Sequence, residues 1–148
     1  MKILIDADGC PVVDLSIRLA KKAGIGAMIF CDSSHVFERE GVPTITVMKG
    51  WDAVDFELIK YIETGDIVVT QDYGLAAMAL AKEGRAISQN GLVFTPANID
   101  QLLASRHMAQ KARKAKVRLK GPAKRILEDD VAFEMALKRL LPPHNIHQ

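Results

Sequence analysis

The first 95 residues alternate short apolar runs with amphipathic stretches, and this alternation is the feature that most limits the possible folds. The runs KILIDA, AMIFCD, TITVMK, DIVVTQ, AISQ and GLVFT are predicted strands. Between them, apolar residues recur at helical spacing, as in DAVDFELIKYIETG, whereas SSHVFEREGVP is predicted to be a polar connection or a short helix. Strands that alternate with helices indicate an α/β fold with a mainly parallel sheet flanked by helices.

Local signals place several helix ends. Pro11 stands where the first position of a helix ending at Gly24 is expected. Thr95 and Pro96 are typical of a helix start, and the pattern after them is helical only, with a last helix that stops before two prolines. We therefore expect a single domain over residues 1–148, with an α/β core over 1–105 and a basic, helical C-terminal extension over 106–148.

Composition narrows the setting of the protein. No apolar stretch approaches the roughly 20 residues that a membrane-spanning helix needs. Cys10 and Cys31 have neither metal-type spacing nor a secretory context, so both are predicted to be reduced thiols. These features predict a cytoplasmic protein with no membrane partner.

Basic residues are concentrated in one segment. Residues 106–127 carry nine basic and no acidic side chains, whereas residues 1–105 carry nine basic and fourteen acidic ones. Lysine and arginine make the phosphate contacts of nucleic-acid-binding proteins, although this segment lacks aromatic residues for base stacking, and a solvated connector would have the same composition. The predicted nucleic-acid-binding residues are Lys111, Arg113, Lys114, Lys116, Arg118, Lys120, Lys124 and Arg125.

Acidic residues follow or precede the predicted strands in a way that brings them together. Asp6 and Asp8 come after the first strand, Asp72 follows the fourth, and Asp52 and Asp55 open the helix between the third and fourth. The carboxyl ends of parallel strands meet at one edge of a sheet, where ligands collect. The sequence therefore predicts an acidic pocket at this edge, with Thr70 and Gln71 at its border.

Clustered carboxylates repel one another unless a cation neutralises them. Hard oxygen ligands suit Mg²⁺ or Mn²⁺, which could activate water and stabilise charge on a phosphodiester. A structural explanation is open for three of the acids, because Asp52, Asp55 and Asp72 could simply cap helices. Asp6 is harder to explain in this way, since it stands where an apolar strand residue is expected.

The stretch DFELIKYIETGDIVVTQDYGLA resembles the PIN-domain superfamily, whose members are mostly metal-dependent ribonucleases. The matching features are Asp55, a Gly-containing turn, an apolar strand and then Thr70 and Asp72, with Asp6 after the first strand. The resemblance implies that Asp6, Asp55 and Asp72 are metal ligands. Such nucleases supply one further acid, for which Glu38, Glu40 and Asp8 are the candidates in this chain.

A closer resemblance covers almost the whole chain. The motifs DADGCPV, GWDAVD, GDIVVTQDYGLA, NIDQLL and KGPAKR occur in this order. Together they look like the bacterial YaiI/YqxD family, a PIN-like group without an established biochemical function. The resemblance implies a fold and a set of candidate residues rather than an activity.

Two other chemistries compete for the DADGCP segment. It also resembles the first motif of haloacid-dehalogenase-type phosphatases, which would make Asp6 a nucleophile and Asp8 its acid/base partner. The later motifs of those enzymes are not found in order. Cys10 could be a nucleophile near a helix start, but no histidine is specified as its base, and packing in the turn before Pro11 is the favoured explanation.

The leading hypothesis is a metal-dependent phosphodiesterase acting on RNA. In it, Asp6, Asp55 and Asp72 bind the metal directly, and Asp8 and Asp52 are auxiliary ligands or orient the others. The alternative is a catalytically silent nucleic-acid-binding protein that keeps the fold and lacks a complete ligand set. An aspartate-nucleophile phosphatase is the remaining hypothesis.

Overall fold

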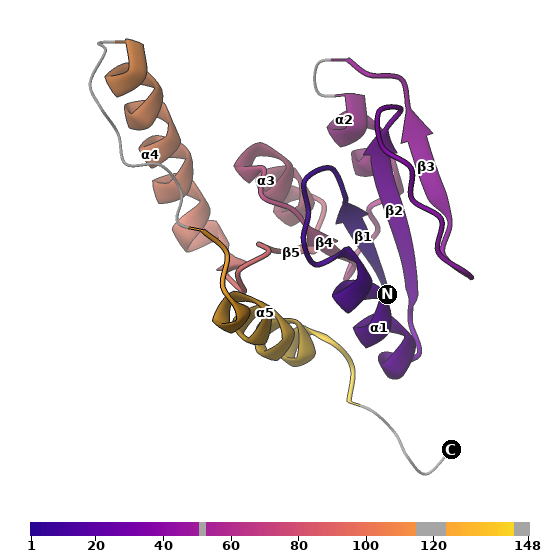
Figure 1. The fold of residues 1–148 in the computed structure, drawn as a ribbon. Coiled ribbons are helices and arrows are strands. Elements are labelled where there is room, and N and C mark those ends of the chain that lie inside the picture. Colours follow the sequence, from indigo (N-terminus) through magenta and orange to yellow (C-terminus); the bar gives the residue numbers. More distant parts are fainter. Residues whose placement is uncertain (51–52, 115–123, 144–148) are drawn as a thin grey trace.

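The strands form one six-stranded sheet in a computed structural model that describes residues 1–50, 53–114 and 124–143 (Figure 1). The strand order is β3-β2-β1-β4-β5-β6; the first five strands are parallel, and β6 is antiparallel to β5. This confirms the predicted α/β fold with a mainly parallel sheet. The strands are β1 (Lys2–Asp6), β2 (Gly26–Asp32), β3 (Thr44–Val47), β4 (Ile67–Val69), β5 (Arg85–Ile87) and β6 (Val93–Phe94).

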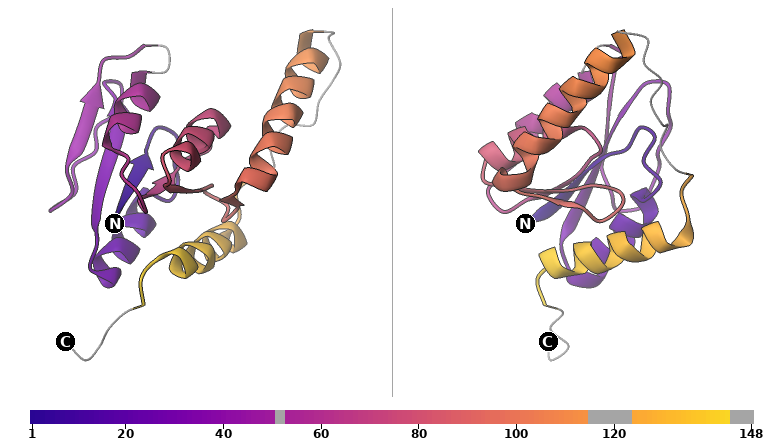
Figure 2. Two further views of the ribbon diagram at one scale, coloured as in Figure 1. Left: turned by 180° about the vertical axis from the view of Figure 1, so that it is seen from behind. Right: turned by 90° about the vertical axis from the view of Figure 1, so that its left-hand side faces the viewer.

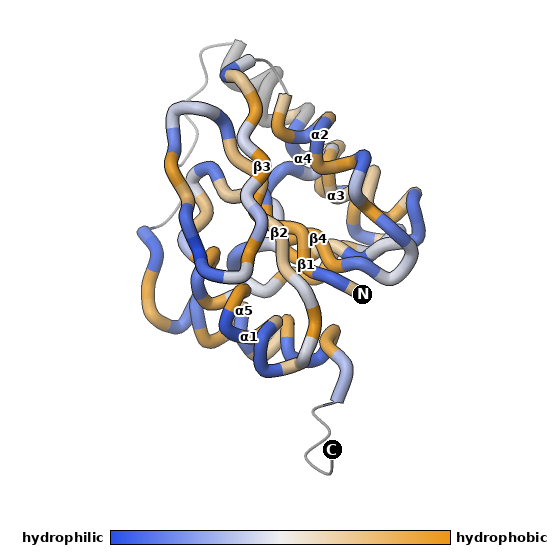
Figure 3. The backbone as a smooth tube through the Cα atoms, turned by 90° about the vertical axis from the view of Figure 1, so that its right-hand side faces the viewer, coloured by the Kyte–Doolittle hydropathy of each residue, from blue (hydrophilic) through white to orange (hydrophobic). Residues whose placement is uncertain are grey.

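Helices cover both faces of the sheet (Figures 1 and 2). On one face, α1 (Val13–Ala23) and α5 (Leu127–Leu140) pack over Ile3 and Ile5 of β1. On the other, α2 (Ala53–Tyr61), α3 (Tyr73–Ala81) and the first turns of α4 (Pro96–Lys114) pack over Leu4. Side chains alternate across a strand, so consecutive residues of β1 supply two cores. Figure 3 shows the central strands as predominantly apolar between more polar outer segments.

The two helix starts that the sequence marks turn out differently. At α4, Thr95 Oγ1 accepts a hydrogen bond from the Asn98 N–H and the Asn98 side chain accepts one from the Thr95 N–H, which confirms the predicted cap. At α1, the placement of Pro11 was wrong, because the helix begins two residues later, at Val13. A turn closed by the Cys10 N–H and the Ala7 carbonyl occupies the intervening chain. The segment 33–43 forms no helix.

Helix α5 is fixed to the sheet through the turn before β6. Gly91 has a φ of +87°, and a Cβ there would lie 2.6 Å from the carbonyl oxygen of Ala132 in α5, so only glycine fits. Arg125, just before the helix, donates to Asp130, to the Asn90 side chain and to the Gln89 carbonyl. These contacts hold the turn that carries Gln89, which also borders the pocket described below.

Both cysteines are free thiols, Cys10 and Cys31, as predicted from the sequence. Within the described part of the chain, no helix is both long and apolar enough to cross a membrane.

Candidate active site at the carboxyl edge of the sheet

The carboxyl ends of three neighbouring strands deliver polar side chains to one edge of the sheet. Strand β1 ends at Asp6, β2 ends at Asp32, and β4 is followed by Thr70 and Asp72. Since β2, β1 and β4 are adjacent and parallel, these residues arrive at the same edge. The sequence-based expectation that the acids converge there is met in part, and the acids divide between three adjoining groups.

Asp6 lies at the centre of this edge, largely buried. A pocket of about 200 Å³ opens above it, and Thr70 Oγ1 donates a 2.8 Å hydrogen bond to its Oδ2. Burial raises the pKa of the Asp6 carboxyl to about 6; the Thr70 hydrogen bond opposes this change, and the negative charges of Asp72 and Asp8 add to it. The pocket is lined by Asp6, Asp8, Gly9, Cys10, Val69, Thr70, Gln71 and Gln89.

Asp72 has two roles at once. As the cap of α3 it accepts a hydrogen bond from the Leu75 N–H, and its own N–H donates to Thr70 Oγ1, which connects it to Asp6. Burial raises the pKa of Asp72, but a hydrogen bond with the Asp55 carboxyl, backbone N–H groups and the charge of Arg106 together hold it below its usual value.

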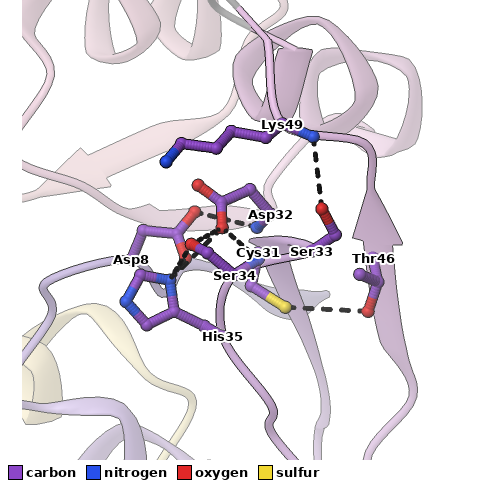
Figure 4. A network of polar contacts seen from close by, with 8 residues as sticks. All are labelled: Asp8, Cys31, Asp32, Ser33, Ser34, His35, Thr46 and Lys49. Carbon is purple, nitrogen blue, oxygen red and sulfur yellow. Dashed lines mark hydrogen bonds and ion pairs between the residues drawn. The ribbon is translucent and has the colours of Figure 1, made fainter.

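Asp8 belongs to a third group that includes Asp32 and His35 (Figure 4). His35 Nδ1 lies 2.8 Å from Asp8 Oδ1 and 3.3 Å from Asp32 Oδ1, and the Asp32 N–H donates to Asp8 Oδ2. One ligand atom from each side chain lies within 4.8 Å of the others, so the three could hold a metal ion. Ser34 hydrogen-bonds to the Asp32 side chain, and this lowers the pKa of that carboxyl.

One oxygen of this group is an exception to the usual rule that buried polar atoms are paired. Asp8 Oδ1 is buried, yet within the described residues no hydrogen bond of regular geometry reaches it, although His35 Nδ1 is near. A buried carboxylate oxygen with an incomplete set of partners, beside an imidazole nitrogen and a second carboxylate, fits the donor set of a divalent cation.

Glu38 and Glu40 lie apart from these groups. Both are exposed on the segment before β3 and line a separate hollow there. Asp52 lies outside the described residues. Thr70 and Gln71 line the pocket at Asp6, where the Gln71 side chain accepts a hydrogen bond from the Gln89 N–H.

Cys10 contributes little nucleophilic character to the pocket that it borders. Burial raises the pKa of its thiol to about 11, so the thiolate is scarce at neutral pH. Its side chain packs against the core beneath α1. The structure thus supports packing over catalysis for this residue.

The basic residues named from the sequence are described to different extents. Lys111, Arg113 and Lys114 belong to α4, and Lys116, Arg118 and Lys120 lie outside the described residues. Lys124 is exposed. Arg125 is only 23% exposed, and its donors are used by Asp130, Asn90 and Gln89, so it holds α5 in place.

Three residues at the edge were missed by the sequence reasoning: Asp32, Gln89 and Arg106. Asp32 ends a predicted strand, so the rule that selected Asp6 could have found it. From the sequence, His35 could be expected with Ser33 and Ser34 to line the pocket, although a polar loop explains these three residues equally well. Gln89 and Arg106 arrive through the packing of a turn and a helix, for which the sequence gives no local signal.

The fold and the site together define an α/β protein with an acidic centre at the carboxyl edge of a parallel sheet. The chain belongs to the family described as Uncharacterized BCR, YaiI/YqxD family, which it matches over residues 4–143. This confirms the resemblance to the YaiI/YqxD family. It is 57% identical to the UPF0178 protein of Exiguobacterium sibiricum, with 95% of this chain and 96% of that protein covered. No solved structure is significantly similar.

A second relative gives the same coverage. The chain is 48% identical to the UPF0178 protein of Ruminiclostridium cellulolyticum, over 98% of this chain and 95% of the relative. The match therefore extends across the sheet, the acidic edge and α5.

Proposed function

We propose that this protein is a metal-dependent phosphodiesterase that cleaves RNA at the acidic edge of its sheet. The observation that carries the proposal is the convergence of Asp6, Asp8 and Asp72 at the ends of adjacent strands, with Asp55 hydrogen-bonded to Asp72. Among the described residues, Asp6 forms no ion pair, although it is largely buried and faces two further acids. A carboxylate placed in this way is suited to a cation.

The donor chemistry at the edge fits a divalent ion. Asp6, Asp72 and Asp55 offer carboxylate oxygens, the ligand type that Mg²⁺ and Mn²⁺ prefer. When bound, the ion would supply charge neutralisation and an acidified water. The Thr70 hydroxyl donates a hydrogen bond to the Asp6 carboxylate and accepts one from the Asp72 N–H, so Thr70 fixes the spacing of these two acids. The likeness to PIN-domain nucleases supports the same arrangement.

Two substitutions test the proposal directly. Asp6→Asn and Asp72→Asn each keep the side-chain shape and remove a charge, so we expect RNA cleavage in Mn²⁺ to be lost in both. Asp14→Asn is the matched control, because Asp14 is 73% exposed on α1 and its one ion pair among the described residues is with the surface arginine Arg39. Cleavage of a labelled single-stranded RNA, followed on a gel with and without chelator, is the measurement. Cleavage by both variants at the wild-type rate would overturn the proposal.

A nucleic-acid-binding protein without catalysis is the second candidate, and one observation favours it. Asp55 and Arg106 already stabilise Asp72 without a metal, through a hydrogen bond and a charge interaction. In that case, RNA would bind to the wild type and to Asp6→Asn equally and would remain uncut in Mn²⁺.

The phosphatase chemistry is disfavoured by the surroundings of Asp8. An acid/base partner for an Asp6 nucleophile needs a carboxyl free to exchange a proton with substrate. Asp8 Oδ2 instead accepts the Asp32 N–H, and its other oxygen faces His35.

A further inference from the structure

A second hollow adjoins the carboxylate pair and has a different lining. It measures about 240 Å³ and lies where α2, α3 and α4 meet. Its lining includes the acids Asp55 and Asp72, the cation Arg106, and apolar side chains among which are Phe56 and Met78. The hollow thus joins two acids, one cation and an apolar surface within the space of a few side chains.

Phe56 is unusual for an aromatic residue next to a polar centre. It is 66% exposed, and Met78 beside it is 44% exposed. By contrast, Phe30 and Phe94 are buried, and each contacts a tyrosine ring edge-on. No aromatic or cationic partner of Phe56 is found among the described residues. An exposed ring in a hollow offers a flat face on which a planar group can stack.

Arg106 places a positive charge in the lining of the same hollow as Phe56. Its Nη1 lies 3.8 Å from Asp72 Oδ1, which is too long for a hydrogen bond, and the side chain is 49% exposed. The guanidinium therefore retains donors for a further ligand. Because phosphate groups are repelled by Asp55 and Asp72, a cation in this lining is what a phosphate needs in order to approach.

We propose that this hollow is a nucleotide subsite for single-stranded RNA, in which Phe56 stacks on a base and Arg106 binds the adjoining phosphate. The subsite rests on the proposed function, because it serves the same carboxylates. A base can reach Phe56 only when it is unstacked from its neighbours, so the site selects single strands over duplexes. Arg106 and Phe56 are thereby residues that determine specificity.

The test compares binding of one RNA sequence as a single strand and as a duplex. Fluorescence anisotropy of the labelled RNA in Ca²⁺ buffer, with a gel to verify that the RNA stays intact, gives the dissociation constants. We expect Phe56→Leu and Arg106→Gln each to weaken single-strand binding about tenfold and to change duplex binding little. Phe56→Trp should bind at least as tightly as the wild type, because it keeps a stacking face.

Matched controls separate the subsite from general surface effects. Leu127→Ala removes an equally exposed apolar side chain on α5, and Arg18→Gln removes an exposed arginine on α1. Both should bind RNA like the wild type. Equal losses in these controls, or wild-type binding by Phe56→Leu and Arg106→Gln, would overturn the subsite.

The result also distinguishes this subsite from the proposed function. If the wild type cuts no RNA in Mn²⁺ while Phe56→Leu and Arg106→Gln still lose single-strand binding, the nuclease proposal fails and the subsite is supported. If cleavage requires Asp6 but both variants bind and cut like the wild type, the subsite fails and the nuclease proposal is supported.

Discussion

Two aspartates at opposite edges of the same sheet, Asp66 fully buried and Asp6 partly buried, have very different surroundings. Asp66, before β4, is 2% exposed; its carboxylate accepts the Lys2 N–H and the Glu63 N–H and pairs with Lys2 Nζ at 2.6 Å. Asp6, at the end of β1, has the Thr70 hydroxyl and two acidic neighbours. The protein therefore satisfies one buried carboxylate fully and leaves the other in need of positive charge.

This difference separates a structural acid from a functional one. A buried carboxylate with a cation and two N–H donors stabilises the fold and has no capacity left for a ligand. A carboxylate that is removed from water without a cation destabilises the metal-free fold. Its presence indicates a ligand whose binding compensates for this loss of stability. Substitution of Asp66 should therefore affect mainly stability, and substitution of Asp6 mainly activity.

Catalysis should show the largest effect. Asp6→Asn is expected to lower the rate of Mn²⁺-dependent RNA cleavage by at least about a hundredfold, since a metal ion contributes several kcal/mol to a phosphodiester transition state. Asp66→Asn should leave the rate per folded molecule unchanged. The measurement is the initial rate divided by the folded fraction from circular dichroism. Equal losses in the two variants would remove the distinction.

The free energy of unfolding should fall more in Asp66→Asn than in Asp6→Asn. Asp66→Asn leaves the Lys2 ammonium, which is 22% exposed, without its buried partner, and we expect a loss of about 3 kcal/mol in the free energy of unfolding. Urea denaturation in chelator at neutral pH measures it. Glu63→Gln is the matched control, because Glu63 is 80% exposed and also pairs with Lys2, and it should cost less than about 1 kcal/mol. A loss in Asp66→Asn no larger than in this control would contradict the structural assignment.

Asp6→Asn should stabilise the metal-free protein at neutral pH. The folded-state pKa of Asp6, about 6, lies above the usual value of 3.8, so ionisation opposes folding, and this penalty is absent below pH 4 and complete above pH 6. We expect the variant to gain about 1–3 kcal/mol at pH 7.5 and almost nothing at pH 4. Urea denaturation in chelator at the two pH values is the measurement. A gain that does not depend on pH would contradict the assigned cause.

Addition of Mn²⁺ should reverse the stability advantage of Asp6→Asn over the wild type. A divalent ion that binds only the folded state raises stability, and the gain grows with the logarithm of the ion concentration above the dissociation constant. Mn²⁺ should therefore raise the melting temperature of the wild type and leave that of Asp6→Asn unchanged. His35→Ala separates the two candidate metal groups, since His35 lies with Asp8 and Asp32 and contributes no atom to the pocket at Asp6. If His35→Ala abolishes the shift while Asp6→Asn retains it, the ion binds at the Asp8 group instead.

The sequence could predict Asp6 and Asp72 because their positions follow from a local rule. Each comes directly after an apolar strand, and parallel strands place their carboxyl ends together whatever the details of packing. Asp55 was named from its place at a helix start, and its hydrogen bond with Asp72 depends on how α2 lies beside α3. The family likeness supplied that pairing, which the pattern alone leaves open.

Residues that arrive through packing could not be predicted in this way. Arg106 reaches Asp72 because α4 packs on α3, and a rotation of the helix by one residue would aim it elsewhere. Arg125 was grouped with the basic segment by charge, but its contacts with Asp130 and the turn at Gln89 need the docked position of α5. Charge and spacing predict where basic residues occur in the chain, and tertiary contacts decide which remain available.

The smallest effect should come from the residue that joins the two acids. Thr70→Val keeps the side-chain volume and removes the hydroxyl that donates to Asp6 and accepts from the Asp72 N–H. We therefore expect the free energy of unfolding to fall by about 1 kcal/mol. In the wild type, the hydrogen bond from Thr70 lowers the pKa of Asp6. Removing this hydrogen bond should therefore raise the pKa of the Asp6 carboxyl in the variant. Thr70→Ser keeps the hydroxyl and should behave like the wild type. NMR titration of the Asp6 carboxyl carbon in chelator is the measurement, and an unchanged titration in Thr70→Val would show that burial alone sets the protonation of Asp6.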